Sequence, residues 1–379
     1  MYDLIVIGAG AIGSATAYHA AKAGHKVLLL EQYAIDHQRG SSYGYSRIIR
    51  YAYDHAIYVE LAKAAYPAWH TFEQESGETI YTRTGGLDLA PPGEPLFEAM
   101  EKNLSDADIV HFVLDANEAR ELYPQFQPDA DMQILYQPDA GLLRASKSVK
   151  AHVRLAQQYG ADVRDDTPVV KITPLTDGVE VTTSSGTFSA ARLVMASGAW
   201  LRQMALPLGL KLPLQPIAPQ ENYFNALAPE QFTPEHFPVW IAHVQAEYGH
   251  ILYGLPNVDG SGVKIGLHSG PPIDPASPER MPDAQTSALM LDFAQKYIPQ
   301  AAGALASSRV CLYTLTPDEH FIIDHHPEYP QVIIASCCSG HAFKFSTLLG
   351  SILSDLAFTG KSAHDIRPFA LSRFGKIEA

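Results

Sequence analysis

The first candidate site in this 379-residue chain is a glycine-rich loop, Gly8-Ala9-Gly10-Ala11-Ile12-Gly13, followed 18 residues later by Glu31. Glycines at this spacing permit a tight turn, a close approach of the backbone to a pyrophosphate, and close packing of a helix on a strand. A carboxylate in the position of Glu31 accepts hydrogen bonds from ribose hydroxyls. The pattern predicts a dinucleotide site that includes every residue of the loop except Ala9. The acid disfavours NADP but does not separate NAD from FAD.

The second group consists of cations in unusual surroundings. Lys264 lies in an alternating apolar stretch, where an unpaired ammonium group would be costly to bury. Lys344 lies between two phenylalanines in a glycine-containing loop, which disfavours a simply solvated lysine. Arg50 belongs to the polar, aromatic segment 36–53, which is too long and too charged for a plain connection. A guanidinium and an ammonium group together could bind the carboxylate of an amino acid.

The third feature is Cys311, one of three cysteines, in the stretch RVCLYTLTPDEHFIID. The other two, Cys337 and Cys338, are adjacent, so the set makes neither a disulfide framework nor a zinc pattern. Composition alone would make Cys311 a small buried hydrophobe. The cysteine usage fits a reducing compartment.

The elements that position these residues can be predicted from periodicity. Tyr2–Ile7 predicts a buried strand, Ser14–Ala23 a helix of small residues, and Lys26–Leu30 a second strand. After residue 141 the chain again alternates helix and strand, and residues 213–317 are rich in strands of a mixed or antiparallel kind. Further elements are expected at 58–75 (helix), 85–89 (strand), 146–159 (helix), 169–172, 179–183, 192–196, 321–324 and 331–335 (strands) and 346–356 (helix).

The fold prediction is therefore α/β plus α+β, with a Rossmann-type βαβ nucleotide domain and a substrate domain built on a mixed or antiparallel sheet. We expect the nucleotide domain to comprise residues 1–80, 142–212 and 318–379. The substrate domain would comprise 81–141 and 213–317. A chain of this length exceeds what a single core usually supports.

Charge and hydropathy limit the partners. The formal charge of −14 argues against a nucleic-acid binder, which needs a basic face. No apolar run approaches the roughly 20 residues of a membrane span. The first strand leaves no room for a targeting peptide, and the C-terminal residues Lys376–Ala379 are not a peroxisomal address. We expect a cytoplasmic protein without nucleic-acid or membrane partners.

The chain resembles the family of FAD-dependent amine oxidases that includes monomeric sarcosine oxidase, N-methyltryptophan oxidase and L-pipecolate oxidase. The resemblance covers nearly the whole length. It rests on the glycine loop and on six ordered blocks: residues 40–50, 253–256, 264–268, 311–314, 317–324 and 339–345.

The resemblance implies an FAD in a glutathione-reductase-like domain, linked covalently through its 8α carbon to a cysteine sulfur that Cys311 matches. Enzymes of the family oxidise the C–N bond of a secondary amino acid, pass the electrons to O2 and release hydrogen peroxide. The imine product hydrolyses to an aldehyde and an amine, or remains cyclic. We expect a monomer of this kind, with a small-molecule substrate.

The resemblance also assigns roles. Arg50 and Lys344 match the pair that binds the substrate carboxylate, and Tyr253 and His268 match residues on the substrate side. Arg47 and Lys264 match residues beside the flavin, where the lysine promotes oxygen reduction. Further residues expected at the cofactor are Ser41, Ser42, Val170, Ser197, Gly198, Trp200, Gly340 and Phe343, besides Arg47, Cys311 and Lys344.

Two departures bear on the substrate. Members of the family carry two histidines, or serine and histidine, where this chain has Ser42-Tyr43, so Tyr43 places a phenol in a substrate-binding position. The segment 243–250 is also longer than in sarcosine oxidase. Pipecolate or N-methyltryptophan specificity, an amine dehydrogenase using another acceptor, a non-catalytic flavin subunit and an NAD-dependent oxidoreductase all remain open.

Overall fold

The computed structural model describes residues 1–277 and 280–375, so the C-terminal Lys376–Ala379 lies outside the described residues. The chain opens with β1 (Tyr2–Ile7), α1 (Ala11–Lys22) and β2 (Val27–Leu30), and β1 pairs in parallel with β2. The helix begins three residues earlier than the sequence predicted, because the extended backbone of Gly10 already caps it. Its first turn therefore belongs to the glycine loop.

β1 and β2 belong to an eight-stranded sheet in the order β10-β11-β12-β1-β2-β9, in which β21 also pairs with β12 and β20 with β21. The additional strands are β9 (Asp162–Arg164), β10 (Val169–Leu175), β11 (Gly178–Thr183), β12 (Gly186–Met195), β20 (Ile322–His325) and β21 (Val332–Ser336).

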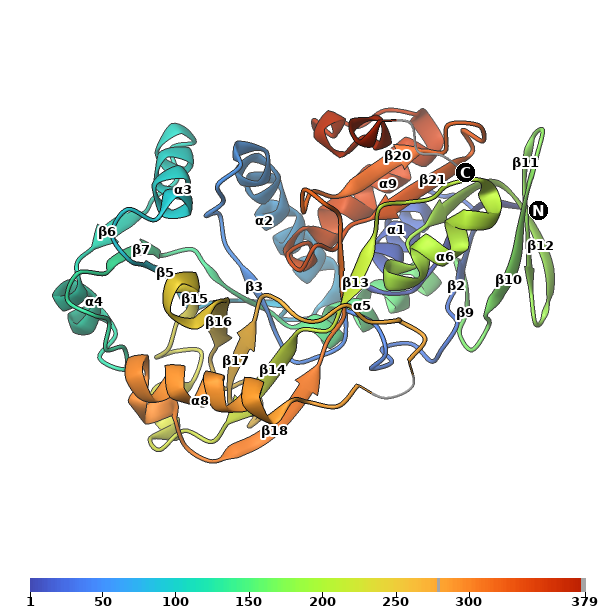
Figure 1. Cartoon of the computed structure of the whole chain (residues 1–379). Helices are drawn as coiled ribbons and strands as arrows, with labels where there is room; N and C mark the ends of the chain where they lie inside the picture. Colours follow the sequence, from blue (N-terminus) through green and yellow to red (C-terminus); the bar gives the residue numbers. More distant parts are fainter. Residues whose placement is uncertain (278–279, 376–379) are drawn as a thin grey trace.

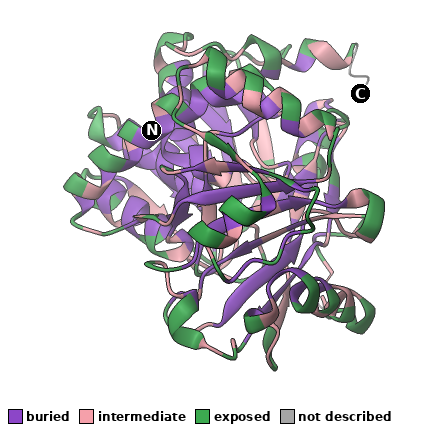
Figure 2. Ribbon diagram, turned by 90° about the vertical axis from the view of Figure 1, so that its left-hand side faces the viewer, coloured by how far each residue is buried: buried purple, intermediate pink, exposed green. Residues whose placement is uncertain are grey.

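Alternate residues of β1 enter two cores on the two faces of this sheet. Leu4 and Val6 pack with α1, α2 (Ala56–Ser76), α5 (Ala145–Gln158) and α9 (Ser346–Thr359). Ile5 and Ile7 pack with the short helix α6 (Leu201–Ala205) and its neighbours. Figure 1 shows this layered region around α1, α9 and β21, and Figure 2 shows its strands buried beneath partly exposed helices.

The second eight-stranded sheet has the order β18-β14-β17-β16-β15-β5-β7-β6. Its strands are β5 (Gly86–Ala90), β6 (Phe112–Leu114), β7 (Gln133–Gln137), β14 (Gln220–Phe224), β15 (Val239–His243), β16 (Ile251–Leu255), β17 (Val263–Leu267) and β18 (Leu305–Val310). All its pairings are antiparallel except that of β5 with β15.

One face of the second sheet packs on α8 (Ala284–Tyr297), which lies along its lower side in Figure 1. In β17 the residues Val263, Ile265 and Leu267 enter this core. Because side chains alternate along a strand, Lys264 and Gly266 face the other way. That opposite face carries the candidate site.

Two small sheets connect the larger ones. One has the order β3-β8-β4 and the other pairs β13 with β19. Their strands are β3 (Arg47–Ile49), β4 (Tyr81–Arg83), β8 (Gly141–Leu143), β13 (Gln215–Ile217) and β19 (Tyr313–Leu315). β4 lies just inside the predicted substrate segment but pairs with a strand at the start of a nucleotide segment. The exact domain limits stay a prediction.

Within residues 1–277 and 280–375, no helix is long and apolar enough to cross a membrane. The same part of the chain contains no cluster of three or more histidine, cysteine, aspartate or glutamate residues arranged to hold a metal ion.

Candidate functional site

A single cavity of about 830 Å³ runs between the two large sheets. At one end it is lined by the glycine loop and Glu31, and at the other by residues of the second sheet and of the loop that precedes α9. Lys264, Cys311 and Lys344, which lie far apart in the sequence, all line it. The cavity therefore unites the residue groups that the sequence analysis singled out.

The nucleotide end is shaped by close backbone approaches. Gly8 has φ +98°, and a Cβ atom there would lie 2.6 Å from the carbonyl oxygen of Ala196. The N–H of Ala11 donates to Ser42 Oγ at 2.9 Å, and Glu31 Oε2 accepts from the N–H of Ala9 at 2.8 Å. This cradle at the start of a helix suits a pyrophosphate. The residues present thus fit the FAD that the sequence resemblance implies.

One predicted cofactor residue lies elsewhere. Val170 is 72% exposed, while its neighbour Val169 lines the cavity. The register of β10 against β11 shifts between Val169 and Lys171, so a bulge at Val170 changes which residue faces inward. A cofactor contact of Val170 itself stays a prediction, since its side chain does not line the cavity. Ser41, Ser42, Ser197, Gly198, Trp200 and Phe343 do line the cavity.

A row of residues crosses the second sheet on its cavity side. Register pairs connect Asp88 of β5 to Ile241, Ile241 to Tyr253, and Tyr253 to Gly266. The row continues from Gly266 to Glu221 of β14, and then to Arg309 of β18. A Cβ atom on Gly266 would lie 2.5 Å from the Tyr253 ring, so glycine leaves room for that ring to lean across β17. The two ends of this row carry the charged groups described next.

At the β5 end, Arg50 forms an ion pair with Asp88 through Nη1. His243 Nε2 lies 3.2 Å from the same carboxylate oxygen of Asp88. Burial acts to raise the pKa of Asp88, but Arg50 and His243 outweigh it, so the pKa falls below its usual value. Asp88 is therefore ionised and holds Arg50 at the edge of the cavity.

Lys344 is the second cation of this end, and only 6% of it is exposed. Its ammonium donates to Tyr53 Oη at 2.7 Å and to the carbonyl oxygen of His341 at 2.8 Å. Within the described residues it has no carboxylate at ion-pair distance. Burial, reinforced by Arg50, holds the pKa of Lys344 well below its usual value. An incoming carboxylate would supply the missing counter-charge.

At the β14 end, Lys264 forms an ion pair with Glu221, and both side chains are 2% exposed. The hydroxyl of Tyr223 donates to Glu221 Oε1 at 2.9 Å. Burial acts to raise the pKa of Glu221, but Lys264 and Arg47 lower it to about 2. Burial lowers the pKa of Lys264, and Glu221 opposes that shift.

Arg47 and Cys311 adjoin this pair. The guanidinium of Arg47 donates to the carbonyl oxygens of Ser46, Ser41 and Tyr43 at 2.8–2.9 Å, which fixes its direction. Burial and then Glu221 raise the pKa of the Cys311 thiol to about 12, so the free thiol is neutral at physiological pH.

The cavity is also lined by His268, Tyr253 and Gly340. Burial, followed by Lys344 and Arg50, lowers the pKa of His268 to about 4, so its imidazole is neutral near pH 7. Burial holds the pKa of Tyr253 well above its usual value. Gly340 has φ +77°, and a Cβ there would lie 2.5 Å from the Tyr313 ring. This glycine lets the loop before α9 touch the cavity wall.

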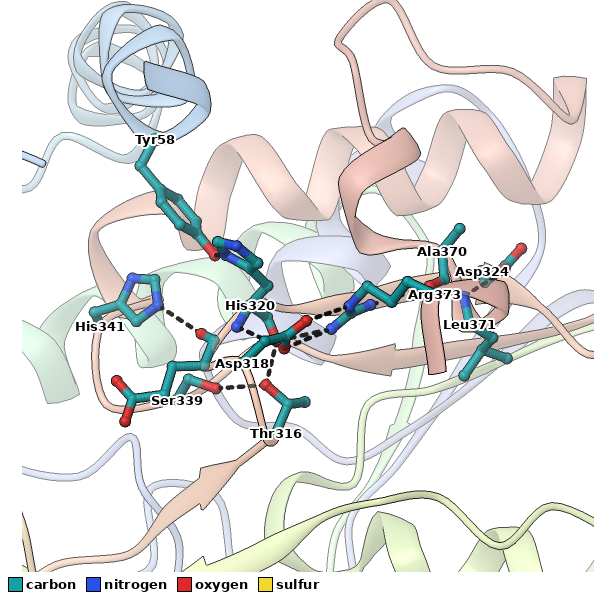
Figure 3. A network of polar contacts seen from close by, with 11 residues as sticks. Tyr58, Thr316, Asp318, His320, Asp324, Ser339, His341, Ala370, Leu371 and Arg373 are labelled. Carbon is teal, nitrogen blue, oxygen red and sulfur yellow. Dashed lines mark hydrogen bonds and ion pairs between the residues drawn. The ribbon is translucent and has the colours of Figure 1, made fainter. Parts of the chain in front are cut away.

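Hydrogen bonds link two loops near Lys344, residues 316–321 and 337–345 (Figure 3). Arg373 Nε donates to Asp318 Oδ2 at 2.8 Å, which fastens one loop to the C-terminal region. His341 Nε2 lies 3.2 Å from the carbonyl oxygen of Glu319, joining that loop to the loop 337–345. The backbone that carries Lys344 is thus linked, through Glu319 and Asp318 in the cavity wall, to the C-terminal region.

The structure places Tyr43 differently from the other predicted substrate residues. Its ring lies beneath the Arg309 guanidinium, 5.0 Å from the ring centre, and its hydroxyl accepts from Gln38 Nε2 at 3.3 Å. Arg309 also lies over Tyr45 and Tyr223. Tyr43 lines the cavity but belongs to this aromatic group beside β14 and β18.

Two acids of the site, Asp88 and Glu221, were not predicted from the sequence. A lone aspartate in the apolar strand GLDLA could have marked Asp88 as a buried charge in need of a partner. Glu221 lies in the polar stretch PQEN, which offers no such contrast. His243 was noticed only as part of a long segment.

Comparison with known proteins agrees with this geometry. The family model described as "FAD dependent oxidoreductase" matches residues 3–356. The chain is 37% identical to monomeric sarcosine oxidase of Bacillus sp. (strain NS-129), over 98% of this chain and 97% of that protein. It is 31% identical to N-methyl-L-tryptophan oxidase of Yersinia pestis (strain Pestoides F), over 98% and 99%.

Among solved structures, NikD, described as an unusual amino acid oxidase essential for nikkomycin biosynthesis, superimposes with a TM-score of 0.87. The identity is 25%, and 97% of each chain is covered. The cradle, the paired cations and the match over nearly the whole length lead to one conclusion: the chain belongs to the family of FAD-dependent oxidoreductases.

Proposed function

We propose that this protein oxidises the C–N bond of a secondary amino acid, N-methylated or cyclic, with FAD as cofactor and O2 as electron acceptor. One observation carries the proposal: the same cavity is lined by the nucleotide cradle and by two groups of cations. These groups are Arg50 with Lys344, and Arg47 with Lys264. The similarity to sarcosine and N-methyltryptophan oxidases supports the same reaction. Hydrogen peroxide and an imine would be the products, and the imine would hydrolyse to an aldehyde and an amine.

Arg50 and Lys344 would bind and orient the substrate carboxylate. Asp88 forms an ion pair with Arg50, so this end of the cavity has two cations, Arg50 and Lys344, and one anion, Asp88. A monocarboxylate neutralises the remaining charge. The neutral imidazole of His268 can accept a hydrogen bond from the substrate amine, and the protonated Tyr253 phenol can donate one.

Bound FAD would supply the redox chemistry, as acceptor of a hydride equivalent from the substrate carbon and donor of electrons to O2. Lys264 would stabilise the negative charge that develops on O2, as a fixed cation in a dry site. Arg47, held by three carbonyl oxygens, would supply a second fixed positive charge.

Cys311 would bind the cofactor covalently. Its place in the cavity wall supports this, as does its proximity to Arg47, Lys264 and Glu221. Acid denaturation tests the link directly: flavin that stays with the precipitated protein supports it, and flavin that remains in the supernatant contradicts it.

Anaerobic mixing with sarcosine, other N-methyl amino acids and L-pipecolate tests the reaction. Loss of the flavin's visible absorbance with at least one of these compounds, followed by stoichiometric peroxide on admitting air, is the expected result. If none of them reduces the flavin, the proposal is wrong. Reduction without peroxide would instead indicate a dehydrogenase with another acceptor.

We also propose that the protein works as a cytoplasmic monomer. None of its three cysteines, all of them among the described residues, forms a disulfide, in keeping with a reducing compartment. The match to a relative named monomeric sarcosine oxidase supports the oligomeric state. Sedimentation velocity of the purified protein would contradict the proposal by showing a dimer.

A further inference from the structure

Glu221 is a buried acid on the side of the cavity where oxygen would react. Only 1% of the residue is exposed, and its carboxylate contacts the Lys264 ammonium and accepts from the Tyr223 hydroxyl at 2.9 Å. Its register partner on β17 is Gly266, so no side chain separates Glu221 from its lysine. The carboxylate is thus part of the wall that carries the reacting cation.

The burial of this pair makes each partner dependent on the other. An isolated ammonium group in a dry site loses its proton because the charged form is poorly solvated. In the described part of the chain, Glu221 is the one carboxylate at ion-pair distance from Lys264. The other groups that face the lysine are Arg47 of β3, the phenols of Tyr223 and Tyr253, and the thiol of Cys311.

These other groups cannot replace the acid. Arg47 repels the ammonium and lowers the pKa of Lys264, as burial does. The pKa values of both phenols are raised, so they remain neutral. A Cys311 sulfur bound to the cofactor would also be uncharged. Glu221 is therefore the group that opposes the loss of the lysine proton.

We propose that Glu221 is a positioning residue that keeps Lys264 protonated and fixes its ammonium in the cavity wall, so that the reoxidation of the reduced flavin does not depend on pH across the neutral range. This inference rests on the proposed role of Lys264. In the step concerned, two electrons and two protons leave the reduced FAD and reach O2, giving oxidised FAD and H2O2. Glu221 gains and loses no proton in the step.

The test measures reoxidation alone. The holoenzyme is reduced anaerobically with dithionite, so that no substrate is needed, and mixed with oxygenated buffer between pH 6 and pH 10. The wild-type rate should be flat through the neutral range. In Glu221→Gln the rate should fall as pH rises, by about tenfold per pH unit above the lowered pKa of Lys264. Glu221→Asp, which restores a carboxylate, should restore the flat profile.

The Lys264→Met variant distinguishes a failure of the role proposed for Lys264 from a failure of the role proposed for Glu221. This variant should be slow at every pH, and the double variant Glu221→Gln/Lys264→Met should match it. If Lys264→Met reoxidises as fast as the wild type, the role of Lys264 fails, and that of Glu221 fails with it. If Lys264→Met is slow but Glu221→Gln is flat or faster than wild type, only the Glu221 proposal is overturned.

A second readout needs no flavin. The protein is prepared in a Cys311→Ser background, from which flavin can be removed. Its reductive methylation with formaldehyde and cyanoborohydride, followed by mass spectrometry of the Lys264 peptide, reports at which pH the amine becomes reactive. Glu221→Gln should shift that pH downward relative to wild type, and an unchanged pH would contradict the proposal. Glu221→Leu, which fills the space without a polar group, should give the same shift and serves if the glutamine variant does not fold.

Discussion

Replacing Lys344 by methionine should weaken the binding of carboxylates without unfolding the protein. The substitution removes one buried ammonium donor from the proposed carboxylate site and keeps a side chain of similar length. A hydrogen bond to a charged group contributes about 1.5–3 kcal/mol. At about 1.4 kcal/mol per factor of ten, the dissociation constant of a carboxylate ligand should rise roughly 10- to 150-fold.

The assay uses ligands that cannot be oxidised at a C–N bond. Acetate and propionate are titrated into the oxidised holoenzyme, and the change in the flavin spectrum gives the dissociation constant. Acetamide, a neutral isostere of acetate, should bind both proteins equally. Lys63→Met is the matched control, because Lys63 is an exposed lysine whose one ion-pair partner among the described residues is Glu60. A carboxylate affinity within a factor of two of wild type would refute the assignment of Lys344.

The pH dependence has a definite sign. Burial, reinforced by Arg50, lowers the pKa of Lys344 in the free protein, and a bound carboxylate raises it again. Binding therefore takes up a proton between the lowered pKa of the free protein and the raised pKa of the complex, so wild-type affinity should fall as pH rises through that interval. In Lys344→Met this decline should be absent. A decline of the same steepness in the variant would mean that another group titrates.

Three further outcomes follow from named contacts. Cys311→Ser should give a folded protein whose flavin stays in solution after acid precipitation; flavin retained in the pellet would show a link elsewhere. Gly340→Ala places a Cβ 2.5 Å from the Tyr313 ring at φ +77°, so thermal unfolding should shift downward by several degrees and flavin content should fall, whereas Gly360→Ala, with nothing within 4 Å, isolates the cost of the φ alone. Asp88→Asn leaves the partly buried Arg50 without its counter-ion, and we expect a loss of about 3–5 kcal/mol in the free energy of unfolding by urea. A loss below about 1 kcal/mol would mean that solvent already screens the pair.

The sequence was sufficient for the elements with strong local patterns. β1 has the predicted bounds, and α9 begins at Ser346 and is capped by Gly360 in the left-handed conformation, as its sequence indicated. The gathering of Lys264, Cys311 and Lys344 at one cavity was expected only through the family resemblance. Periodicity alone says which way a side chain points but not which distant strand lies beside it.

The acids show this limit most clearly. Asp88 meets His243 because β5 pairs with β15, and Glu221 meets Lys264 through the register of β14 on β17. Neither pairing has a local cause in the sequence, since strand register is set by the whole sheet. The exposed side chain of Val170 shows the opposite limit: a local bulge in β10 interrupts the alternation from which side-chain directions are predicted.

The row of residues across the second sheet separates the acid beside the substrate-binding cations from the acid beside the cation that would assist the reaction with O2. From β5 through β15, β16 and β17 to β14 there are four strand spacings, which place Asp88 and Glu221 about 19 Å apart at about 4.8 Å per spacing. Effects of substitutions more than about 10 Å apart usually add. Substrate preference and oxygen reactivity could therefore change independently in evolution, one acid at a time, on an unchanged sheet.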